Sequence, residues 1–124
     1  MTQLRGIRGA TTVENDIREE ILDSTEDLLK QLISENELSL DDIATAIFTV
    51  TPDIVAAFPA EAARVRLNWT DGAFISAQES PVPGAPTKCI RVLLLVNTHK
   101  PKSDIHHVYL KRASELRKRG LDEK

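Results

Sequence analysis

The chain is poor in several residue types and patterns, and each shortage removes a class of protein. Its 124 residues include one cysteine, so an internal disulfide is excluded and no cysteine-rich zinc pattern is available. Sixteen basic residues are outnumbered by 19 acidic ones, whereas nucleic-acid-binding modules usually carry a basic excess. The sequence has no apolar run long enough for a membrane span and no charged-then-apolar leader. These features predict a cytosolic globular domain that binds neither nucleic acid nor membrane.

Familiar catalytic motifs are missing as well. The sequence contains no Gly-x-Ser-x-Gly elbow and no phosphate-binding loop, and Gly6 and Gly9 lack the dinucleotide-binding spacing. His106 and His107 are adjacent, so they point to different sides of a strand or helix and are poorly placed to share a metal ion. Cys89 has no histidine nearby in the sequence, which predicts a buried, unreactive thiol. We therefore expect no metal site.

The most informative stretch is the apolar run KCIRVLLLV at residues 88–96. Apolar residues at both alternating positions predict a strand buried on both faces. Arg91 interrupts the run, and on a strand it would share a face with Cys89 and Leu93. Because a guanidinium group cannot lose its charge, burying it without a partner is strongly unfavourable. Arg91 therefore needs an anion, which is either a carboxylate of the chain or a ligand.

The rest of the chain alternates between strand-like and helix-like patterns. The strand patterns lie at residues 3–9, 46–50, 73–79 and 88–96, with Gly6 and Gly9 marking close backbone approach or a bulge. The strongest helical pattern covers residues 17–35, with Asp16 as its N-cap and Glu19 as the capping-box partner. Further helices are expected at residues 40–44 and from Pro59 to about residue 68.

Two segments do not fit a regular pattern. Residues 80–86 are rich in proline and predict an irregular loop, while residues 104–119 fit neither a strand nor a helix well. The order of the strand and helix patterns along the chain predicts an α/β or α+β fold in which helices pack on one sheet. We expect a single domain over residues 1–124, with a mobile tail at 118–124.

Four polar residues stand in or beside apolar strand-like stretches: Arg8, Glu79, Arg91 and Tyr109. One interpretation is a buried salt bridge between Arg91 and Glu79. The other is an anion pocket, in which the arginines hold carboxylates and Glu79 accepts a hydrogen bond from a hydroxyl group. The residue pattern alone leaves both interpretations open.

Six separated blocks, in order, resemble the monofunctional chorismate mutases of the AroH type. They are RGIRGATTVE at 5–14, TPD at 51–53, AFPA at 57–60, QE at 78–79, CIRV at 89–92 and HVYL at 107–110. The resemblance runs over almost the whole chain and fades after Arg117. It implies a mixed β-sheet packed with helices, a homotrimeric pseudo-α/β-barrel with active sites between neighbouring subunits, and a strand around residues 108–113.

The resemblance also implies a reaction, the conversion of chorismate to prephenate on the route to phenylalanine and tyrosine. In this Claisen rearrangement one ether C–O bond breaks and one C–C bond forms within the same molecule, without a cofactor. The enzyme would hold a dianion in a folded conformer and stabilise negative charge on the ether oxygen. The alternative is a non-catalytic trimeric module that binds a small ligand in its interface cleft, because fold does not fix function.

The same resemblance assigns roles to individual residues. Arg91 would donate to the ether oxygen and to a substrate carboxylate, and Glu79 would accept the ring hydroxyl, with Ser76 beside it. Arg8 and Tyr109 would hold the side-chain carboxylate. The pocket would be walled and closed by residues of the neighbouring subunit and of the C-terminal segment: Phe58, Ala60 and Arg64 from the neighbour, and Leu116 and Arg117 from the C-terminal segment.

Two positions depart from some relatives, which have a cysteine in place of Ser76 and a lysine in place of Glu61. Serine can still contact a hydroxyl group, but glutamate cannot attract an anionic substrate, so Glu61 is not counted among the binding residues. Ser76 and Glu79 also have opposite parity on a regular strand. Both can line one site only if the strand bulges or ends between them.

Overall fold

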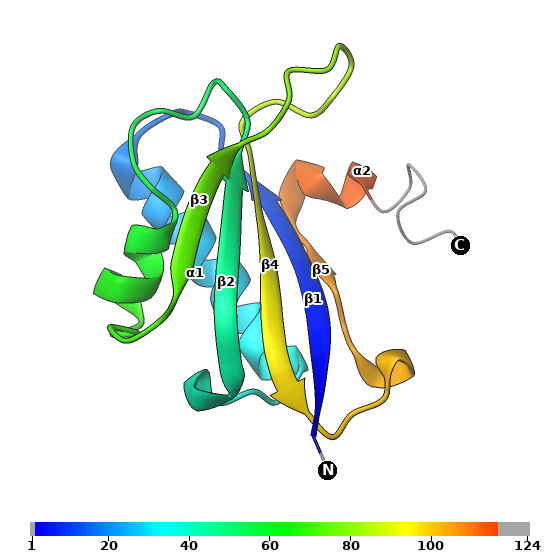
Figure 1. The fold of residues 1–124 in the computed structure, drawn as a ribbon. Helices are drawn as coiled ribbons and strands as arrows, with labels where there is room; N and C mark the ends of the chain where they lie inside the picture. The colour runs from blue at the N-terminus through cyan, green and yellow to red at the C-terminus, as the bar shows by residue number, and fades with distance from the viewer. Residues whose placement is uncertain (1, 117–124) are drawn as a thin grey trace.

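The computed structural model describes residues 2–116 and is built around a five-stranded mixed sheet (Figure 1). Its strands are β1 (Gln3–Thr12), β2 (Ile43–Val50), β3 (Phe74–Gln78), β4 (Cys89–Thr98) and β5 (Val108–Tyr109). They lie in the order β3-β2-β4-β1-β5, and β4 pairs antiparallel with both of its neighbours. The α+β class is confirmed, and the strand that carries Arg91 is the central one. Arg117 and the tail predicted at 118–124 lie outside the described residues.

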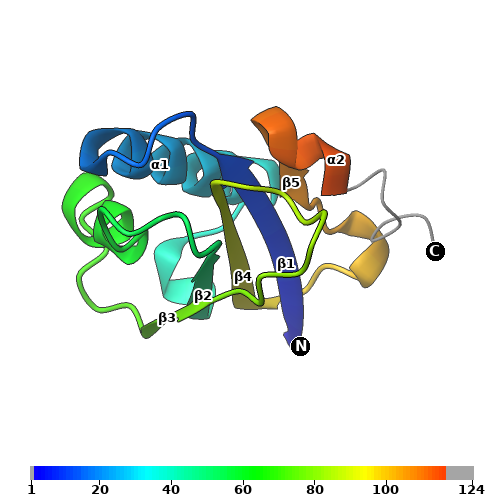
Figure 2. The ribbon, with the colours of Figure 1, turned by 90° about the horizontal axis from the view of Figure 1, so that it is seen from above.

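One long helix, α1 (Arg18–Glu35), lies across one face of the sheet (Figures 1 and 2). The other helical segments are short: η1 (Leu40–Asp42), η2 (Ala62–Arg66), η3 (Lys102–Asp104), η4 (Lys111–Ala113) and α2 (Ser114–Leu116). None of the helices in the described part of the chain combines the length and the hydropathy that a membrane span requires.

The start of α1 differs from the predicted capping box. The helix begins at Arg18, and the residue before it has extended backbone and makes no side-chain cap. The Asp16 carboxylate instead accepts hydrogen bonds from the backbone N–H groups of Val55 and Ala56, at 3.0–3.1 Å. The predicted pairing of Asp16 with Glu19 is therefore wrong, because Asp16 ties the helix entry to a distant loop.

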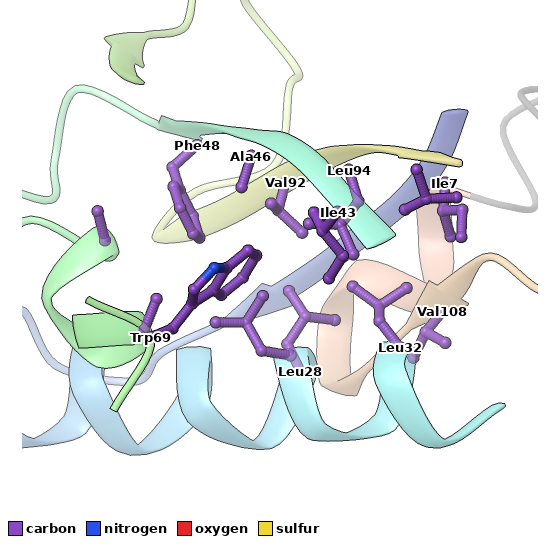
Figure 3. Packing of buried hydrophobic residues seen from close by; sticks show 14 residues of the cluster. Ile7, Leu28, Leu32, Ile43, Ala46, Phe48, Trp69, Val92, Leu94 and Val108 are labelled. Atoms are coloured by element: carbon purple, nitrogen blue, oxygen red, sulfur yellow. The ribbon is translucent and has the colours of Figure 1, made fainter. Parts of the chain in front are cut away.

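The core fills the space between α1 and the sheet. Figure 3 shows Leu28 and Leu32 of α1 pointing toward the side chains of Phe48, Val92 and Leu94 on the sheet. Trp69 is buried in this cluster, and its ring meets Phe74 edge to face with 4.9 Å between ring centroids. Apolar residues at helical spacing on α1 supply one side of the core, as the sequence pattern predicted.

Gly9 allows α1 to approach β1 closely. A Cβ atom at Gly9 would lie 2.6 Å from Cδ1 of Leu32 and 3.2 Å from Cδ1 of Leu28. At Gly6 the nearest atom to such a Cβ would be 3.5 Å away, on Leu93, which is ordinary contact. The close approach predicted for these glycines is thus confirmed at Gly9 and not needed at Gly6.

The segment expected to be an ordinary helix from Pro59 contains a π-helix, η2. The N–H group of Leu67 donates to the carbonyl of Ala62 at 3.2 Å, five residues back. Single π turns occur frequently at functional sites. Arg66 joins this segment to α1 through three carboxylates, with N–O distances of 3.0, 2.7 and 3.0 Å to Glu19, Asp23 and Glu26.

The face of the sheet turned away from α1 is only partly covered. We call it the open face; the pairing register assigns to it the even-numbered residues 4–10 of β1 and the odd-numbered residues 47–49, 75–77 and 89–95. The opposite face of β4 is fully packed, with buried Ile90, Val92, Leu94 and Val96.

One end of the open face is covered by the C-terminal segment, where Ala113 and Leu116 pack beside Cys89. Further along β4, Leu93 and Leu95 are only half-buried. The prediction that this strand is buried on both faces is therefore wrong for the single chain, because no second layer of described residues packs over the rest of the open face.

The strand expected at residues 108–113 is also shorter than predicted. After β5, Leu110 still donates its N–H to the carbonyl of Ala10 at 2.9 Å. Lys111 then adopts a φ of 54°, which turns the chain out of the sheet and into η4. The prediction of a strand is confirmed for Val108 and Tyr109 and wrong for the residues of η4.

Candidate functional site

The open face contains a hollow of about 320 Å³, which we call the arginine hollow. Its lining residues come from four strands: Arg8, Gly9, Ile47, Thr49, Arg91, Val92, Leu93 and Tyr109. The volume is in the range of small-ligand pockets, roughly 300–1,000 Å³. Three residues singled out from the sequence, Arg8, Arg91 and Tyr109, thus share one hollow.

Strand pairing explains why these residues meet. Ala10 of β1 and Thr49 of β2 lie directly opposite Arg91, one on each side of β4. Tyr109 lies opposite Ala10 in the parallel β1–β5 pair. Arg8 lies opposite Leu93, two residues from Arg91, so the two arginines occupy diagonal positions on one face.

Arg91 and Glu79 form an ion pair through a single contact. Nε of Arg91 lies 3.0 Å from Oε2 of Glu79, and the side chains are 34% and 19% exposed, respectively. The contact is close but poorly aligned, since buried Nε donates no hydrogen bond to any described residue. The salt bridge considered from the sequence is present, but it leaves the hydrogen-bonding capacity of Arg91 partly unused.

Glu79 is held in place by two further hydrogen bonds. Its N–H donates to the carbonyl of Val50 at 2.9 Å, which extends the β2–β3 pairing by one residue. The hydroxyl of Thr49 donates to Oε2 of Glu79 at 2.6 Å. Sequence reasoning missed Thr49; the signal available was that the two threonines of an otherwise apolar strand, Thr45 and Thr49, are four residues apart and so lie on one face.

The charge balance of the arginine hollow favours an anion. Among the described residues, the hollow is lined by two permanent cations, Arg8 and Arg91, and Arg91 contacts one carboxylate, Glu79. The half-buried apolar side chains of Ile47 and Leu93 line the same space. Apolar walls lower the local dielectric and strengthen the field of both guanidinium groups. The arrangement is suited to a small carboxylate-bearing ligand with hydrogen-bond donors and an acceptor within reach.

A second hollow, of about 390 Å³, lies at the other side of β3, and we call it the Phe58 hollow. Its lining includes Phe58 and Ser76, together with Val50, Ile54, Val55, Ala56, Ala57, Pro59, Glu61, Ala77 and Gln78. β3 pairs with β2 without a bulge, so Ser76 and Glu79 point to opposite faces. Within one chain, Ser76 therefore accompanies Phe58 and not Glu79.

The remaining residues assigned to the neighbouring subunit belong to the same segment as Phe58. Phe58 itself is 64% exposed, whereas Ala60 is buried in the core. Arg64 is exposed on η2. Glu61, which replaces a lysine of some relatives, forms an ion pair of 2.8 Å with Arg18 of α1. Its carboxylate therefore serves the packing of this segment on α1.

The C-terminal segment borders the arginine hollow. Leu116 is buried and packs with Ala10, Cys89 and Ala113, and half-buried Tyr109 contacts the same cluster. Burial raises the pKa of the Cys89 thiol to about 11, despite the nearby positive charge of Arg91. The predicted burial of the thiol is confirmed, and the raised pKa disfavours the reactive thiolate.

In the described part of the chain, the two adjacent histidines belong to no cluster of metal ligands. Within residues 2–116, no three side chains of histidine, cysteine, aspartate or glutamate gather as metal ligands would. His106 is exposed, and Nδ1 of half-buried His107 accepts a hydrogen bond from the backbone N–H of Arg8 at 3.0 Å.

Comparison with known proteins gives one consistent family. Residues 4–119 match the family model described as chorismate mutase type I. The chain is 45% identical over 114 residues to the chorismate mutase AroH of Bacillus subtilis (strain 168), covering 92% of this chain and 90% of that protein. It is 47% identical over 115 residues to the chorismate mutase AroH of Thermus thermophilus, covering 92% and 93%. A solved chorismate mutase from Clostridium thermocellum superposes with a TM-score of 0.87 at 50% identity, over 90% of this chain and 98% of that one.

Proposed function

This chain belongs to the chorismate mutase type I family, a family of isomerases, and on that premise we propose that it converts chorismate to prephenate in the arginine hollow. The product would serve the cytoplasmic synthesis of phenylalanine and tyrosine. The observation that carries the proposal is the gathering of Arg8, Arg91 and Tyr109 around one hollow, with Glu79 at its edge.

The reaction requires only that the protein bind the charged and polar groups of the substrate, and the arginine hollow contains side chains that can do so. Chorismate carries two carboxylates, a ring hydroxyl and an enolpyruvyl ether. The ether C–O bond breaks and a C–C bond forms in the same molecule, so no proton or electron enters or leaves. The protein needs only to select a folded conformer and to stabilise negative charge that grows on the ether oxygen.

Arg91 is the group best suited to the ether oxygen. Its side chain lines the hollow, is 34% exposed and has only one misaligned contact, from Nε to Glu79, so a bound substrate would complete its donor set. A fixed donor aimed at developing charge typically contributes about 3 kcal/mol to transition-state stabilisation. Glu79, fixed by Thr49, would accept the ring hydroxyl, while Arg8 and Tyr109 would hold the side-chain carboxylate.

We propose that the complete site contains residues of two subunits of a homotrimer. In one chain the arginine hollow is open on the partly covered sheet face, and Phe58 and Val55 are 64% and 80% exposed beside the Phe58 hollow. A neighbour that brings its Phe58 hollow against the arginine hollow would wall the site with Phe58, Ser76, Ala60 and Arg64. It would also cover apolar residues of the open face, including Ile75, which is 61% exposed. Leu116 and Arg117 would close the site from the C-terminal side.

The decisive test of the activity is direct. Purified protein is mixed with chorismate, and loss of chorismate absorbance is followed against the uncatalysed background. We expect rapid conversion with prephenate as the product. A flat trace from folded protein would favour the alternative of a non-catalytic small-ligand module.

Subunit complementation tests whether two chains share one site. Arg91→Ala and Arg64→Ala each impair every site of their own homotrimer, and the two variants are then co-refolded in equal amounts. Suppose that Arg91 and Arg64 of one site come from different chains. In randomly mixed trimers each of the two positions is then wild type in about half of the sites, so about a quarter of the sites contain both arginines and roughly a quarter of wild-type activity returns. If both come from the same chain, mixing restores nothing. Light scattering that reports a monomer would contradict the shared site independently.

A further inference from the structure

We infer that His107 is a positioning residue for the arginine hollow: its ring nitrogen Nδ1 fixes the backbone of Arg8 and thereby the spacing between Arg8 and Tyr109. The inference rests on the proposed function, because it concerns how well these two residues hold a substrate carboxylate.

The hydrogen bond between Arg8 and His107 links β1 to the residue before β5, and these two strands otherwise have few contacts. β5 has two residues and pairs with β1 only at Gly9–Val108 and Ala10–Tyr109. On the far side of this short pair, Leu110 donates its N–H to the carbonyl of Ala10. On the near side the backbone N–H of Arg8 donates to Nδ1 of His107 at 3.0 Å. Because the ladder is so short, the contacts at its ends set where Tyr109 lies relative to Arg8.

The backbone position of His107 is fixed because the residue before it, His106, is hydrogen-bonded to Asn36 at the end of α1. Asn36, the residue after α1, is buried, and its side chain binds both backbone polar groups of His106. Oδ1 of Asn36 accepts from the His106 N–H at 2.8 Å, and Nδ2 donates to the His106 carbonyl at 2.9 Å. Nδ2 also donates to the carbonyl of Leu32 at 2.9 Å. The His107 ring is therefore carried by backbone that is anchored to the rigid helix.

The hydrogen bond specifies the protonation state of the ring. A nitrogen that accepts from an N–H group carries no proton, so the neutral imidazole has its hydrogen on Nε2.

Three substitutions separate the role of Nδ1 from that of ring volume. His107→Asn places an acceptor at the Nδ1 position, His107→Gln places one at the Nε2 position, and His107→Leu has none. His106→Leu is the matched control, because the His106 side chain is exposed and its backbone contacts remain. Steady-state kinetics with chorismate then give KM and kcat separately, and thermal unfolding gives the stability of each variant.

We expect His107→Leu and His107→Gln to raise KM about tenfold, the effect of one hydrogen bond lost with its partner left unpaired, while kcat stays within about threefold. His107→Asn and His106→Leu should keep the wild-type KM.

The outcomes distinguish the two proposals. A wild-type chain that does not convert chorismate would overturn the proposed function. An active chain in which His107→Leu lowers the unfolding temperature but keeps the wild-type KM would overturn only the positioning role. Equal KM values for the Asn and Leu variants would do the same, because ring volume and not the acceptor would then matter.

Discussion

The hydroxyl of Thr49 donates a hydrogen bond to Oε2 of Glu79 at 2.6 Å, across the parallel pair of β2 and β3. The same oxygen lies 3.0 Å from Nε of Arg91. One carboxylate oxygen thus receives a well-formed hydrogen bond from a neutral hydroxyl and a close but misaligned contact from a cation. Thr49 fixes the orientation of Glu79, and this leaves Arg91 able to turn its donors toward a ligand.

Replacing Thr49 by valine should therefore impair catalysis without unfolding the protein. The substitution keeps the branched shape and removes the hydroxyl, so Glu79 can rotate onto Arg91 and engage it more fully. We expect kcat/KM for chorismate to fall about tenfold, the usual effect of one hydrogen bond to a charged group. Thr49→Ser keeps the hydroxyl and should remain near wild type. Equal kinetics for the valine and serine variants would exclude this role.

Arg91→Lys should reduce the rate far more than it reduces binding. Lysine keeps the positive charge but loses the planar set of donors, so it cannot serve the ether oxygen and a carboxylate together. We expect kcat to fall by about two to three orders of magnitude, with an unchanged circular dichroism spectrum. Single-turnover measurements with excess enzyme would separate this loss from slow product release.

The control for this experiment is the same substitution at an exposed arginine. Arg18 is half exposed and pairs with Glu61 on the helical side of the molecule, so Arg18→Lys should leave turnover unchanged. Near-normal turnover by Arg91→Lys would contradict the electrostatic role. Unchanged activity in Arg91→Ala would show that the arginine hollow is not the active site.

Much of the fold could be predicted because its signals are local. The spacing of apolar residues predicted the helix observed as α1, and the continuous apolar run predicted the strand observed as β4. The cap of α1 could not be predicted, since Asp16 binds backbone groups about 40 positions away. An apolar run also cannot tell whether its second face is covered by the same chain or by another one. Leu93 and Leu95, on that second face, are only half-buried in the single chain.

The candidate site was predictable in part. Arg91 stood out because a charge in an apolar strand is unusual, and the parity of a straight strand already separated Ser76 from Glu79. Thr49 and His107 did not stand out, because each acts through a contact with a residue at least 30 positions away. Strand register brings such residues together, and register is set by the whole sheet.

Asp53 should make the stability of the fold depend on pH. Asp53 is exposed overall, and the desolvation of its carboxylate opposes ionisation, but hydrogen bonds from the Thr51 hydroxyl and the Lys88 N–H outweigh that effect, so the pKa of Asp53 lies below its ordinary value. A lowered pKa in the folded state contributes stability above the unfolded pKa, about 4, and this contribution is lost as the pH falls through the folded pKa.

The measurement compares Asp53→Asn with wild type in urea at pH 7 and at pH 3. Because solvent screens the interactions of an exposed carboxylate, we expect the variant to lose about 0.5 kcal/mol of unfolding free energy at pH 7 and clearly less at pH 3. Asp71→Asn, at an exposed aspartate in the turn before β3, should show no such difference. An equal loss for Asp53→Asn at both pH values would mean that the carboxylate charge is not involved.

Gly9→Ala should destabilise the protein through the contact between α1 and β1. The added Cβ would lie 2.6 Å from Cδ1 of Leu32 and 3.3 Å from Cγ1 of Val92, so the helix or the strand must move. Overpacking of this kind typically costs about 1–3 kcal/mol of unfolding free energy, measurable by urea denaturation. Gly6→Ala is the matched control on the same strand, because its nearest neighbour would be 3.5 Å away. If both variants lost the same free energy, intrinsic strand preference would explain the effect, and the close approach of α1 at Gly9 would not.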